Sequence, residues 1–479
     1  MKTAWMGVDL GSSGIRIAAY DDSGVTVGQA AVTYAARQRS PGTMIQDPQH
    51  DWRAGFAAAA HRVTKQMTGH HLAGIGLSGL FPAISLVTAT GNPLTEAILY
   101  GDRRSEAYKH AVESILGRTI PTDSMSPHLL RLRQERGALF DEAAWILSPA
   151  ATVGLWLTGE TAVDPQTALR WGGLVAADRG GWDQGAVEAL GLRMAQLPPI
   201  RAATSLLGRL TRQAAEWTGL PVGTPVSVGP TDSLATVLAA GAHHHGQLIV
   251  SYSSSGVVLR NKMPVQAALD ADLLRLQDHP YEILAYLFHS GSAVEHVRTT
   301  LARGASYPVL NSQAGTSSGE PSGIAMLPTG RVGTDNSQRS FATYAMAGMT
   351  DHTSSGDLWR AALESFPFAV RHTVSLTGEG EVFAAGGGAE NDLWRQITTD
   401  VLEKRQKYFE RCATTLGAAA VVAQAVAQAA SATKIVQRWL SLGGSRFAEP
   451  RDDSVAEYQE RRSRWDELFM VAARTRAHR

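Results

Sequence analysis

The chain has 479 residues, 44% of them hydrophobic, and its 44 Lys and Arg residues balance its 44 Asp and Glu residues. This length suggests two or three domains, and the balanced charge gives no reason to expect nucleic acid or a membrane surface as a partner. The single cysteine, Cys412, excludes an intramolecular disulfide and fits a reducing compartment. The N-terminal stretch lacks the long apolar region of a signal peptide, so we expect a cytoplasmic protein.

The N-terminal region predicts a small antiparallel sheet followed by a helix. Short strands joined by tight turns are expected at residues 4–11, 14–24 and 25–34. The sequence DDSG between the second and third strands is a hairpin signal. A helix is expected at about 51–68, with Asp51 as its N-cap.

The middle of the chain alternates strand signals with a long helical region. Residues 72–80 predict an apolar strand that ends in a Gly-rich bend, and residues 83–100 predict a hairpin that turns at Gly91 and Asn92. Residues 105–220 are polar and largely helical in pattern. Residues 222–241 predict a strand, a turn and a helix, in that order.

A second hairpin resembles the first. Residues 247–263 again join two apolar strands through a turn of small residues, and the Ser-Ser-Gly core of SYSSSGV coincides with that of DLGSSGI. We therefore predict two similar domains, residues 1–243 and 244–479. In the second half a strand leads into a helix from about Asp392, an Ala-rich stretch predicts a buried helix that is too short to span a membrane, and residues 451–479 predict an amphipathic helix.

The first hairpin has the chemistry of an anion site. A tight turn of Ser and Gly exposes backbone N–H groups and hydroxyls that can bind phosphate. Asp9 could hold Mg²⁺ and Arg16 could neutralise phosphate charge, although an ordinary Ser-rich hairpin has the same pattern. The Walker A motif and the dinucleotide-binding glycine motif are both missing from the sequence.

Two further segments add chemistry to this picture. Gly386 to Gly388 bend the chain before a helix N-terminus, where an anion or a purine could pack, unless the glycines serve only tight packing. Asp232 follows a strand at or near a helix start, so it is a candidate general base and equally a candidate N-cap. The two roles can coexist.

The order of these pieces resembles that of the FGGY carbohydrate kinases, within the actin-like, ribonuclease-H-like ATPase superfamily. The segments that carry the resemblance nearly end to end are GVDLGSSGIRIAAYDDSG, GIGLSGLFPAISLVTATGNPLTEAILYGDRRS, LWLTGETAVD, GPTDSLATVLAAGA, SYSSSGVVL, SFATYAMAGMTDHTSSGDLWRAALESFPFAVR and AAGGGAENDLWRQITTDVLEKRQ. The resemblance implies an α/β fold of two ribonuclease-H-like domains, each a mixed sheet flanked by helices, with an interdomain cleft. It also implies ATP and Mg²⁺ as cofactors and a small sugar or polyol as the substrate.

The resemblance also implies roles for individual residues. Asp232 falls on the catalytic base, which also contacts the sugar, and Asp9 falls on the acid associated with Mg²⁺. The positions that match nucleotide-binding residues are Ser12, Ser13, Arg16, Ser254, Gly291, Glu295, Gly387 and Asn391. The positions that match sugar-binding residues are Phe81, Pro82, Asp102 and Arg103.

Some positions depart from the family pattern, and they leave the substrate open. Leu80 replaces the usual Gln, Phe81 and Pro82 offer no side-chain hydrogen bonds, and Ser253 replaces a Gly of the second hairpin. The pattern resembles xylulose kinases most, so a ketopentose such as xylulose is the expected acceptor, with gluconate, glycerol and erythritol as alternatives. A sugar- or nucleotide-binding regulator with weakened catalysis is the alternative of another class, and a homodimer is possible by analogy.

Overall fold

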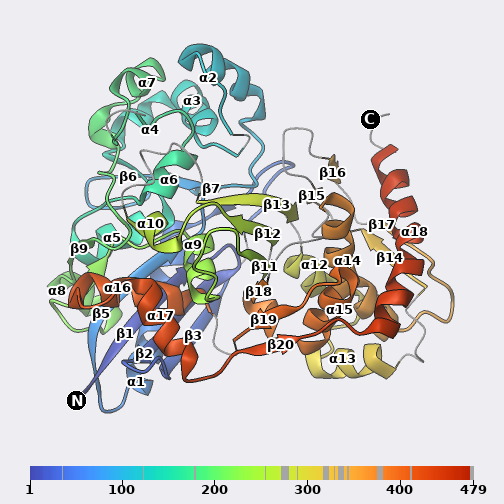
Figure 1. Ribbon diagram of the computed structural model, residues 1–479. Coiled ribbons are helices and arrows are strands. Elements are labelled where there is room, and N and C mark those ends of the chain that lie inside the picture. Colours follow the sequence, from blue (N-terminus) through green and yellow to red (C-terminus); the bar gives the residue numbers. More distant parts are fainter. Residues whose placement is uncertain are drawn as a thin grey trace. The chain divides into compact units, whose positions relative to one another are not determined.

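The computed structural model describes residues 1–34, 36–121, 123–176, 180–253, 255–270, 280–287, 290–316, 323–327, 330–332, 339–341, 345–374, 381–409 and 413–474. The predicted site residue Ser254 and the lone Cys412 lie outside these ranges. The chain forms two compact units (Figure 1). The first unit contains Met1–His243, Met263–Pro280 and Ala413–Leu442, and the second contains His244–Lys262, Tyr281–Cys412 and Gly443–Arg479.

The first unit is built on a six-stranded mixed sheet with the strand order β3-β2-β1-β5-β10-β9. Strands β1, β2 and β3 form the antiparallel meander that the sequence predicts, and β5 runs parallel to β1. The strands span Lys2–Leu10 (β1), Gly14–Asp21 (β2), Thr26–Thr33 (β3), His70–Gly79 (β5), Leu206–Arg209 (β9) and Pro225–Ser227 (β10). Because β10 is also parallel to β5, the carboxyl ends of β1, β5 and β10 lie along one edge of the sheet.

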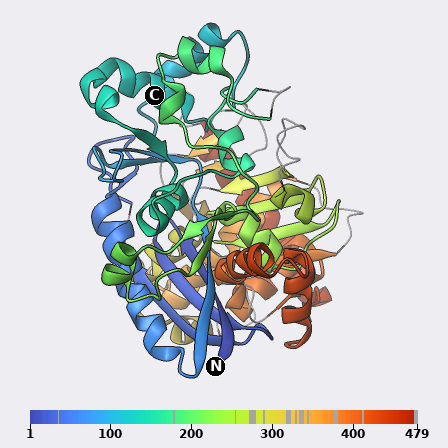
Figure 2. The same ribbon diagram turned by 90° about the vertical axis from the view of Figure 1, so that its left-hand side faces the viewer.

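Helices cover both faces of this sheet. Alternate β1 residues such as Met6 and Val8 share a buried cluster with Phe56 of α1 (Gly55–Gln66). On the other face a Cβ on Gly7 would lie 1.8 Å from a backbone oxygen of α16 (Thr414–Ala427), so that helix rests directly on the strand backbone. Figure 2 shows α1 in blue and α16 in red at the sheet. The Ala-rich segment is therefore a buried helix, as predicted, and it packs on the first unit.

The helix expected at about 51–68 begins differently from the prediction. A π-helical turn over Pro48–Ala54 precedes α1, and its N-cap is Asp47, whose carboxylate accepts hydrogen bonds from two backbone N–H groups. Asp51 instead forms two hydrogen bonds to Arg37, of 2.7 and 2.9 Å. The prediction of Asp51 as the N-cap was wrong, because Pro48 starts the helical turn earlier.

A four-stranded sheet and a group of short helices complete the first unit. The strand order is β4-β7-β6-β8, and the antiparallel pair β6 and β7 confirms the predicted hairpin. The strands span Ile45–Gln46 (β4), Ala83–Val87 (β6), Ala97–Leu99 (β7) and Trp145–Leu147 (β8). The helices span Glu106–Tyr108 (η2), Lys109–Leu116 (α2), Ser126–Glu135 (α3), Gly137–Glu142 (α4), Pro149–Thr158 (α5), Pro165–Arg170 (α6), Gln184–Ala189 (α7), Met194–Gln196 (η3), Arg212–Thr218 (α8), Asp232–Ala239 (α9), Val265–Leu269 (α10) and Ala432–Ser441 (α17).

The second unit repeats the strand order of the first in its own six-stranded sheet, β13-β12-β11-β18-β19-β20. The strands of this sheet span Leu248–Tyr252 (β11), Gly256–Asn261 (β12), Tyr281–Leu287 (β13), Val382–Ala385 (β18), Gln406–Tyr408 (β19) and Arg446–Ala448 (β20). In both sheets an antiparallel three-stranded meander is followed by two parallel strands and an antiparallel edge strand. The two sheets therefore share one topology, while the compact units differ from the predicted bounds of 1–243 and 244–479 because residues 263–280 and 413–442 belong to the first unit.

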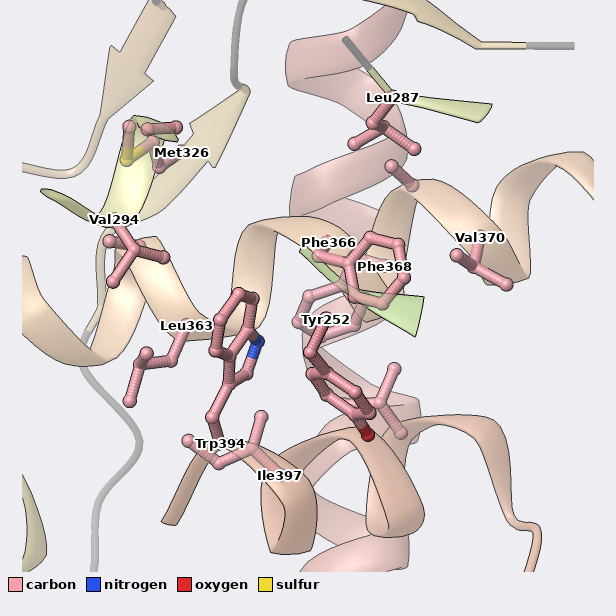
Figure 3. Close-up of a cluster of buried hydrophobic side chains, with 14 of the residues drawn as sticks. Tyr252, Leu287, Val294, Met326, Leu363, Phe366, Phe368, Val370, Trp394 and Ile397 are labelled. Carbon is pink, nitrogen blue, oxygen red and sulfur yellow. The ribbon is translucent and has the colours of Figure 1, made fainter. Parts of the chain in front are cut away.

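Helices and two short strand pairs surround the second sheet. The strand pairs join Ala325–Leu327 (β14) to Ala345–Ala347 (β17) and Gly330–Val332 (β15) to Arg339–Phe341 (β16). The helices span Gly291–His296 (α12), Val297–Leu301 (η4), Tyr307–Thr316 (α13), Ser355–Thr373 (α14), Gly387–Glu390 (η5), Asp392–Leu402 (α15) and Asp452–Arg474 (α18). Figure 3 shows the core of this unit, where Tyr252 lies among Phe366 and Trp394, with ring centroids 5.9 and 5.2 Å away. Within the described ranges, no helix is both long and apolar enough to cross a membrane.

Candidate active site

Two acids lie at the carboxyl edge of the first sheet. Asp9 is the penultimate residue of β1 and is 5% exposed. Asp232 is the first residue of α9, which follows β10. Burial and then the negative charge of Asp9 raise the pKa of Asp232 to about 7, so the two carboxylates lie within electrostatic reach of each other. Residues 223 positions apart in the sequence are thus brought together, because β1 and β10 both run parallel to β5.

The N-cap of α9 is Thr231, and this settles one open reading of Asp232. The Thr231 hydroxyl accepts a hydrogen bond from the Leu234 N–H at 3.3 Å and donates one to the Gln166 side chain at 2.8 Å. Asp232 accepts hydrogen bonds from the adjacent Ser233, from its N–H at 2.6 Å and from its hydroxyl at 3.2 Å. Since capping does not occupy it, the Asp232 carboxylate is available for proton transfer. Sequence reasoning missed the buried Gln166, because nothing in the pattern of α6 indicates its partner on α9.

Asp9 and Arg16 face each other across the first hairpin. They are paired in the register of β1 and β2, and Arg16 Nη1 donates to Asp9 Oδ2 at 3.3 Å. Burial raises the pKa of Asp9 above its ordinary value, and the neighbouring Arg16 offsets only part of that rise. The Arg16 side chain is 56% exposed, so its guanidinium can also reach a ligand. A buried carboxylate with incomplete charge compensation is suited to a cation.

The turn that holds Ser12 and Ser13 is supported from behind by three side chains. Gln46 Nε2 donates to the Ser12 carbonyl at 2.9 Å, and the Tyr34 hydroxyl donates to the Gly11 carbonyl at 3.1 Å. The Ser12 hydroxyl also forms a hydrogen bond with the side chain of Tyr100. Hydrogen bonds with Gln46, Tyr34 and Tyr100 therefore support the turn.

Tyr100 joins this turn to the acid pair. Its ring packs against the buried cluster of Leu80, Ala83 and Leu99. Burial raises the pKa of Tyr100 to about 12, with the nearby Asp232 charge adding to the rise and the Ser12 hydrogen bond opposing it. Tyr100 lies in GIGLSGLFPAISLVTATGNPLTEAILYGDRRS, one of the segments that carry the family resemblance, and this was the signal in the sequence that could have drawn attention to it.

The predicted sugar-binding residues lie at the ends of β5 and β7. Phe81 is partly exposed, whereas Pro82 is buried. The Asp102 side chain is fully enclosed. It accepts three hydrogen bonds from the Arg104 side chain, at 2.7, 2.9 and 3.1 Å, and one from the Met44 N–H at 3.0 Å. Burial raises the pKa of Asp102, but these hydrogen bonds outweigh it and hold the pKa below its ordinary value. Arg103, by contrast, is exposed, and its nearest acid is Glu106 at 3.9 Å.

In the second unit, contacts between side chains connect two of the predicted nucleotide-binding residues. Glu295 of α12 accepts from Arg298 at 2.6 Å and from the Tyr307 hydroxyl at 3.0 Å, and the Arg298 hydrogen bond holds its pKa below the usual value. The Tyr307 ring meets Trp359 edge-on at 5.2 Å. Trp359 Nε1 donates to the Asn311 carbonyl at 2.8 Å, and Asn311 donates to Asn391 at 3.1 Å. A chain of contacts through Tyr307, Trp359 and Asn311 therefore connects Glu295 with Asn391. Sequence reasoning missed these three residues.

The glycine turn before α15 offers an open surface. Gly386 adopts a left-handed conformation with φ 84°, and a Cβ on Gly388 would lie 2.4 Å from the Trp394 ring. Gly387, between them, is exposed, and apart from its chain neighbours no described residue lies within 4 Å of a Cβ built on it, so a flat ligand could approach its backbone. Gly291, the first residue of α12, donates its N–H to the Ser253 carbonyl at 3.0 Å, which places α12 beside the second hairpin.

Two family models match the chain, and both describe the same family. The model for the N-terminal domain of the FGGY family of carbohydrate kinases matches residues 4–239, and the model for its C-terminal domain matches residues 285–427. The chain belongs to the FGGY family of carbohydrate kinases. As an FGGY kinase it is a phosphotransferase that acts on a carbohydrate.

Relatives along the whole chain agree with this assignment. The FGGY kinase is 21% identical to a xylulose kinase of Staphylococcus epidermidis over 98% of its own length and 97% of the relative. Its fold is similar to a ligand-bound xylulose kinase of Lactobacillus acidophilus, with a TM-score of 0.77, 19% identity and 98% coverage of both chains. It is also similar to a gluconate kinase of the same organism, with a TM-score of 0.76, 18% identity and 99% coverage of both chains. The actin-like fold expected from the sequence is confirmed.

Proposed function

We propose that this FGGY kinase transfers the γ-phosphate of ATP to a hydroxyl group of a ketopentose, with xylulose as the first candidate. The observation that carries the proposal is the acid pair of Asp9 and Asp232: burial and the charge of Asp9 raise the pKa of Asp232 to about 7, and Tyr100 connects Asp232 with the turn that holds Ser12. A general base works best when its pKa lies near the working pH. Several curated relatives that span almost the whole chain are named xylulose kinases, which supports this choice of acceptor, although one that spans 97% of the chain is named an autoinducer-2 kinase.

In this mechanism Asp232 accepts the proton of the acceptor hydroxyl as the hydroxyl oxygen attacks the γ-phosphorus in line. The bond from that phosphorus to the bridging oxygen breaks, and ADP leaves. Ser12 and Ser13 donate hydrogen bonds to phosphate oxygens, and Arg16 neutralises charge on the transferred group. Most of the acceleration comes from positioning and charge stabilisation, because the phosphoryl transition state is loose. The supported turn matters here, since groups held in place lose little entropy when the reactants bind.

The residues of the first unit fit a hydrated Mg²⁺ ion brought by the nucleotide. Mg²⁺ usually binds through one or two carboxylates plus phosphate oxygens and keeps several waters. Asp9 offers one buried carboxylate, and no group of three or more acidic, His or Cys side chains was found among the residues that the structure describes. When bound, the ion supplies neutralisation of phosphate charge. Asp9 would hold it through water.

The second unit would bind the rest of the nucleotide. Gly387 offers open backbone to a purine, and the Asn391 amide lies at the start of α15 beside it. Gly291 and Glu295 extend this surface along α12, and Glu295 would act mainly by fixing Tyr307 through their hydrogen bond. Ser254 would bind phosphate from the second hairpin.

The acceptor would contact the first unit near Phe81 and Pro82. Phe81 offers apolar surface, and Asp102 would shape this edge by holding Arg104 and Met44 rather than by direct contact, because its carboxylate is enclosed. The exposed Arg103 favours a second candidate, a sugar acid such as gluconate, since its guanidinium is not closely paired. Glycerol and erythritol are the remaining polyol candidates.

A panel of acceptors tests the proposal. Release of ADP would be measured with xylulose, ribulose, gluconate, glycerol and erythritol, and the products would be mapped by NMR. We expect xylulose to give the highest kcat/KM, with the phosphate on one hydroxyl. A higher kcat/KM for gluconate that falls in Arg103→Ala would replace the ketopentose with the sugar acid. Absence of turnover with every acceptor would refute the proposed reaction.

Two wider properties belong to the same proposal. We place the enzyme in the cytoplasm, where ATP is available. A chain with one cysteine cannot form an intramolecular disulfide, which fits this reducing compartment. A homodimer is proposed by analogy with related kinases. Sedimentation velocity on the purified chain would test the assembly.

A further inference from the structure

Asn311 and Asn391 form a reciprocal pair of side-chain amides in the second unit. Asn311 Nδ2 donates to Asn391 Oδ1 at 3.1 Å, and Asn391 Nδ2 donates to Asn311 Oδ1 at 3.3 Å. The pair joins the exposed part of α13 to the N-cap of α15, and both side chains are half-buried. The amides therefore remain partly accessible to a ligand.

Neighbouring donors determine which way each amide points. An indole N–H and a backbone N–H can only donate hydrogen bonds, so the atom that each of them meets must be a carbonyl oxygen. Trp359 Nε1 donates to Asn311 at 2.8 Å, and the Trp394 N–H donates to Asn391 at 3.1 Å. Both side-chain oxygens are identified in this way, and both amino groups with them.

The pair has no capacity left to accept a hydrogen bond. Each carbonyl oxygen has two lone pairs, and each already accepts two bonds: one from a Trp residue and one from the partner amide. Each amino group has two N–H bonds and uses one of them on its partner amide. Among the residues that the structure describes, this leaves one N–H donor on Asn311 and one on Asn391 for a ligand.

We propose that Asn311, together with Asn391, contacts the purine base of the phosphoryl donor. The pair binds the base only by donating N–H hydrogen bonds to acceptor atoms of the purine. This inference rests on the proposed function, in which the surface around Asn391 binds the nucleotide. An asparagine that recognises adenine specifically uses its oxygen for the 6-amino group and its N–H for N7. Here both oxygens are occupied, so the pair does not read the 6-amino group.

Nucleotide selectivity follows from this geometry. Hypoxanthine carries an oxygen acceptor where adenine carries the 6-amino group, and it keeps the N7 acceptor. A donor-only pair satisfies both bases. A site that hydrogen-bonds a polar group of its ligand binds an analogue lacking that group more weakly, by on the order of 10⁴-fold. A site that contacts the 6-amino group would therefore differ clearly from a donor-only site in its preference for adenine over hypoxanthine.

The experiment compares binding of ADP and IDP by calorimetry, without any sugar, so it does not depend on turnover. We expect the two dissociation constants to agree within about tenfold, the range of a single neutral hydrogen bond. A preference for ADP of more than about a hundredfold would overturn the inference. Failure of both nucleotides to bind would overturn it as well, whereas missing turnover with normal binding would count only against the proposed reaction.

The variant Asn311→Ala distinguishes base recognition from a purely structural role, because only base recognition predicts a change in the ratio of ADP to IDP affinity. Removing Asn311 frees one lone pair on Asn391 Oδ1, which can then accept from the 6-amino group of adenine. We expect weaker binding of IDP and a rise in the preference for ADP of about threefold to tenfold. Equal weakening of both nucleotides, or an unchanged ratio, would contradict the proposal. Asn92→Ala, in an exposed turn of the first unit, is the matched control and should leave the ratio unchanged.

A buried residue offers an independent variant if Asn311→Ala folds poorly. Trp359 is fully buried and cannot touch a ligand, but its indole N–H occupies one lone pair of Asn311. Trp359→Phe keeps an aromatic ring and releases that lone pair. The preference for ADP should rise in this variant as well, and an unchanged preference would refute the role of the occupied oxygens.

Discussion

The two units share one strand order and differ in their chemistry. In the first, Asp9 pairs with Arg16 across the hairpin, and a second acid, Asp232, lies within electrostatic reach. In the second, Ser251 occupies the position of Asp9 in the aligned hairpin and pairs with Val257. The second unit instead carries the neutral amide pair of Asn311 and Asn391.

The two units therefore share a strand order, while the pair of acids Asp9 and Asp232 lies in the first unit. Buried acids whose charge is not fully compensated destabilise a fold, so they indicate a site of chemistry, whereas the buried Glu364 and Asp400 of the second unit are ion-paired with arginines. Asp9 and Asp232 both have raised pKa values, caused mainly by burial. The first unit is thus suited to proton and phosphoryl transfer, and the second to recognition by hydrogen bonds.

The largest effect is expected from removing the charge of Asp232. Asp232→Asn should lower kcat by about 10²–10⁴-fold, the usual contribution of a general base, while the fold is retained. Because burial raises the pKa of Asp232, its ionisation destabilises the folded state as pH rises toward 7. The variant should therefore melt at a higher temperature than the wild type at pH 8, and the difference should shrink toward pH 5. Near wild-type turnover would remove Asp232 from the mechanism.

The next largest effect concerns the packing of α16 on the first sheet. A Cβ on Gly76 would lie 1.9 Å from the Ala418 backbone oxygen, so Gly76→Ala forces the helix away from β5. We expect a loss of about 3 kcal/mol in the free energy of unfolding, at the upper end for overpacking. Gly315→Ala is the control, because that helical glycine of the second unit has open space around it. If Gly76→Ala and Gly315→Ala have equal free energies of unfolding in urea, the close packing of α16 on β5 is wrong.

A smaller effect should follow from the Tyr100 hydroxyl. Tyr100→Phe keeps the aromatic ring and removes the hydrogen bond to Ser12. Its loss loosens the turn that holds Ser12 and Ser13. One such bond is worth about 0.5–1.5 kcal/mol, so kcat/KM for ATP should fall about threefold to tenfold. Tyr108→Phe removes a hydroxyl that binds Glu135 at 3.2 Å, away from the acid pair, and should have no effect on kcat/KM. If both variants behave alike, Tyr100 has no special role.

The smallest expected change is a shift in the pH profile. The base form of Asp232 is required, so kcat/KM for the acceptor should fall as pH is lowered through about 7. Asp9→Asn removes the like charge that raises the pKa of Asp232, and the residual activity should keep its half-maximum at a lower pH than the wild type. A half-maximum that stays in place or moves upward would show that the two acids are not coupled.

Much of the fold could be predicted from local patterns. The meander of β1 to β3, the second hairpin and the buried helix α16 all appear where alternation, turn residues and continuous apolar composition indicate them. The start of the helix near residue 50 could not be predicted, because Asp47 and Asp51 are both good caps and the choice depends on Arg37. The links to Gln166 and Asn311 join distant segments, so no local pattern contains them.

The amino-acid sequence by itself determined the family, the repeated hairpins and the acids that carry the proposed chemistry, since these depend on residue type and order. Only the tertiary structure decided the electrostatic state of those acids, because a pKa depends on burial and on charges that folding brings near. It also decided that Asp102 is enclosed while Arg103 is exposed, although the two are adjacent in the chain. Hydrogen-bond partners and solvent access are properties of packed surroundings, which neighbours in sequence do not share.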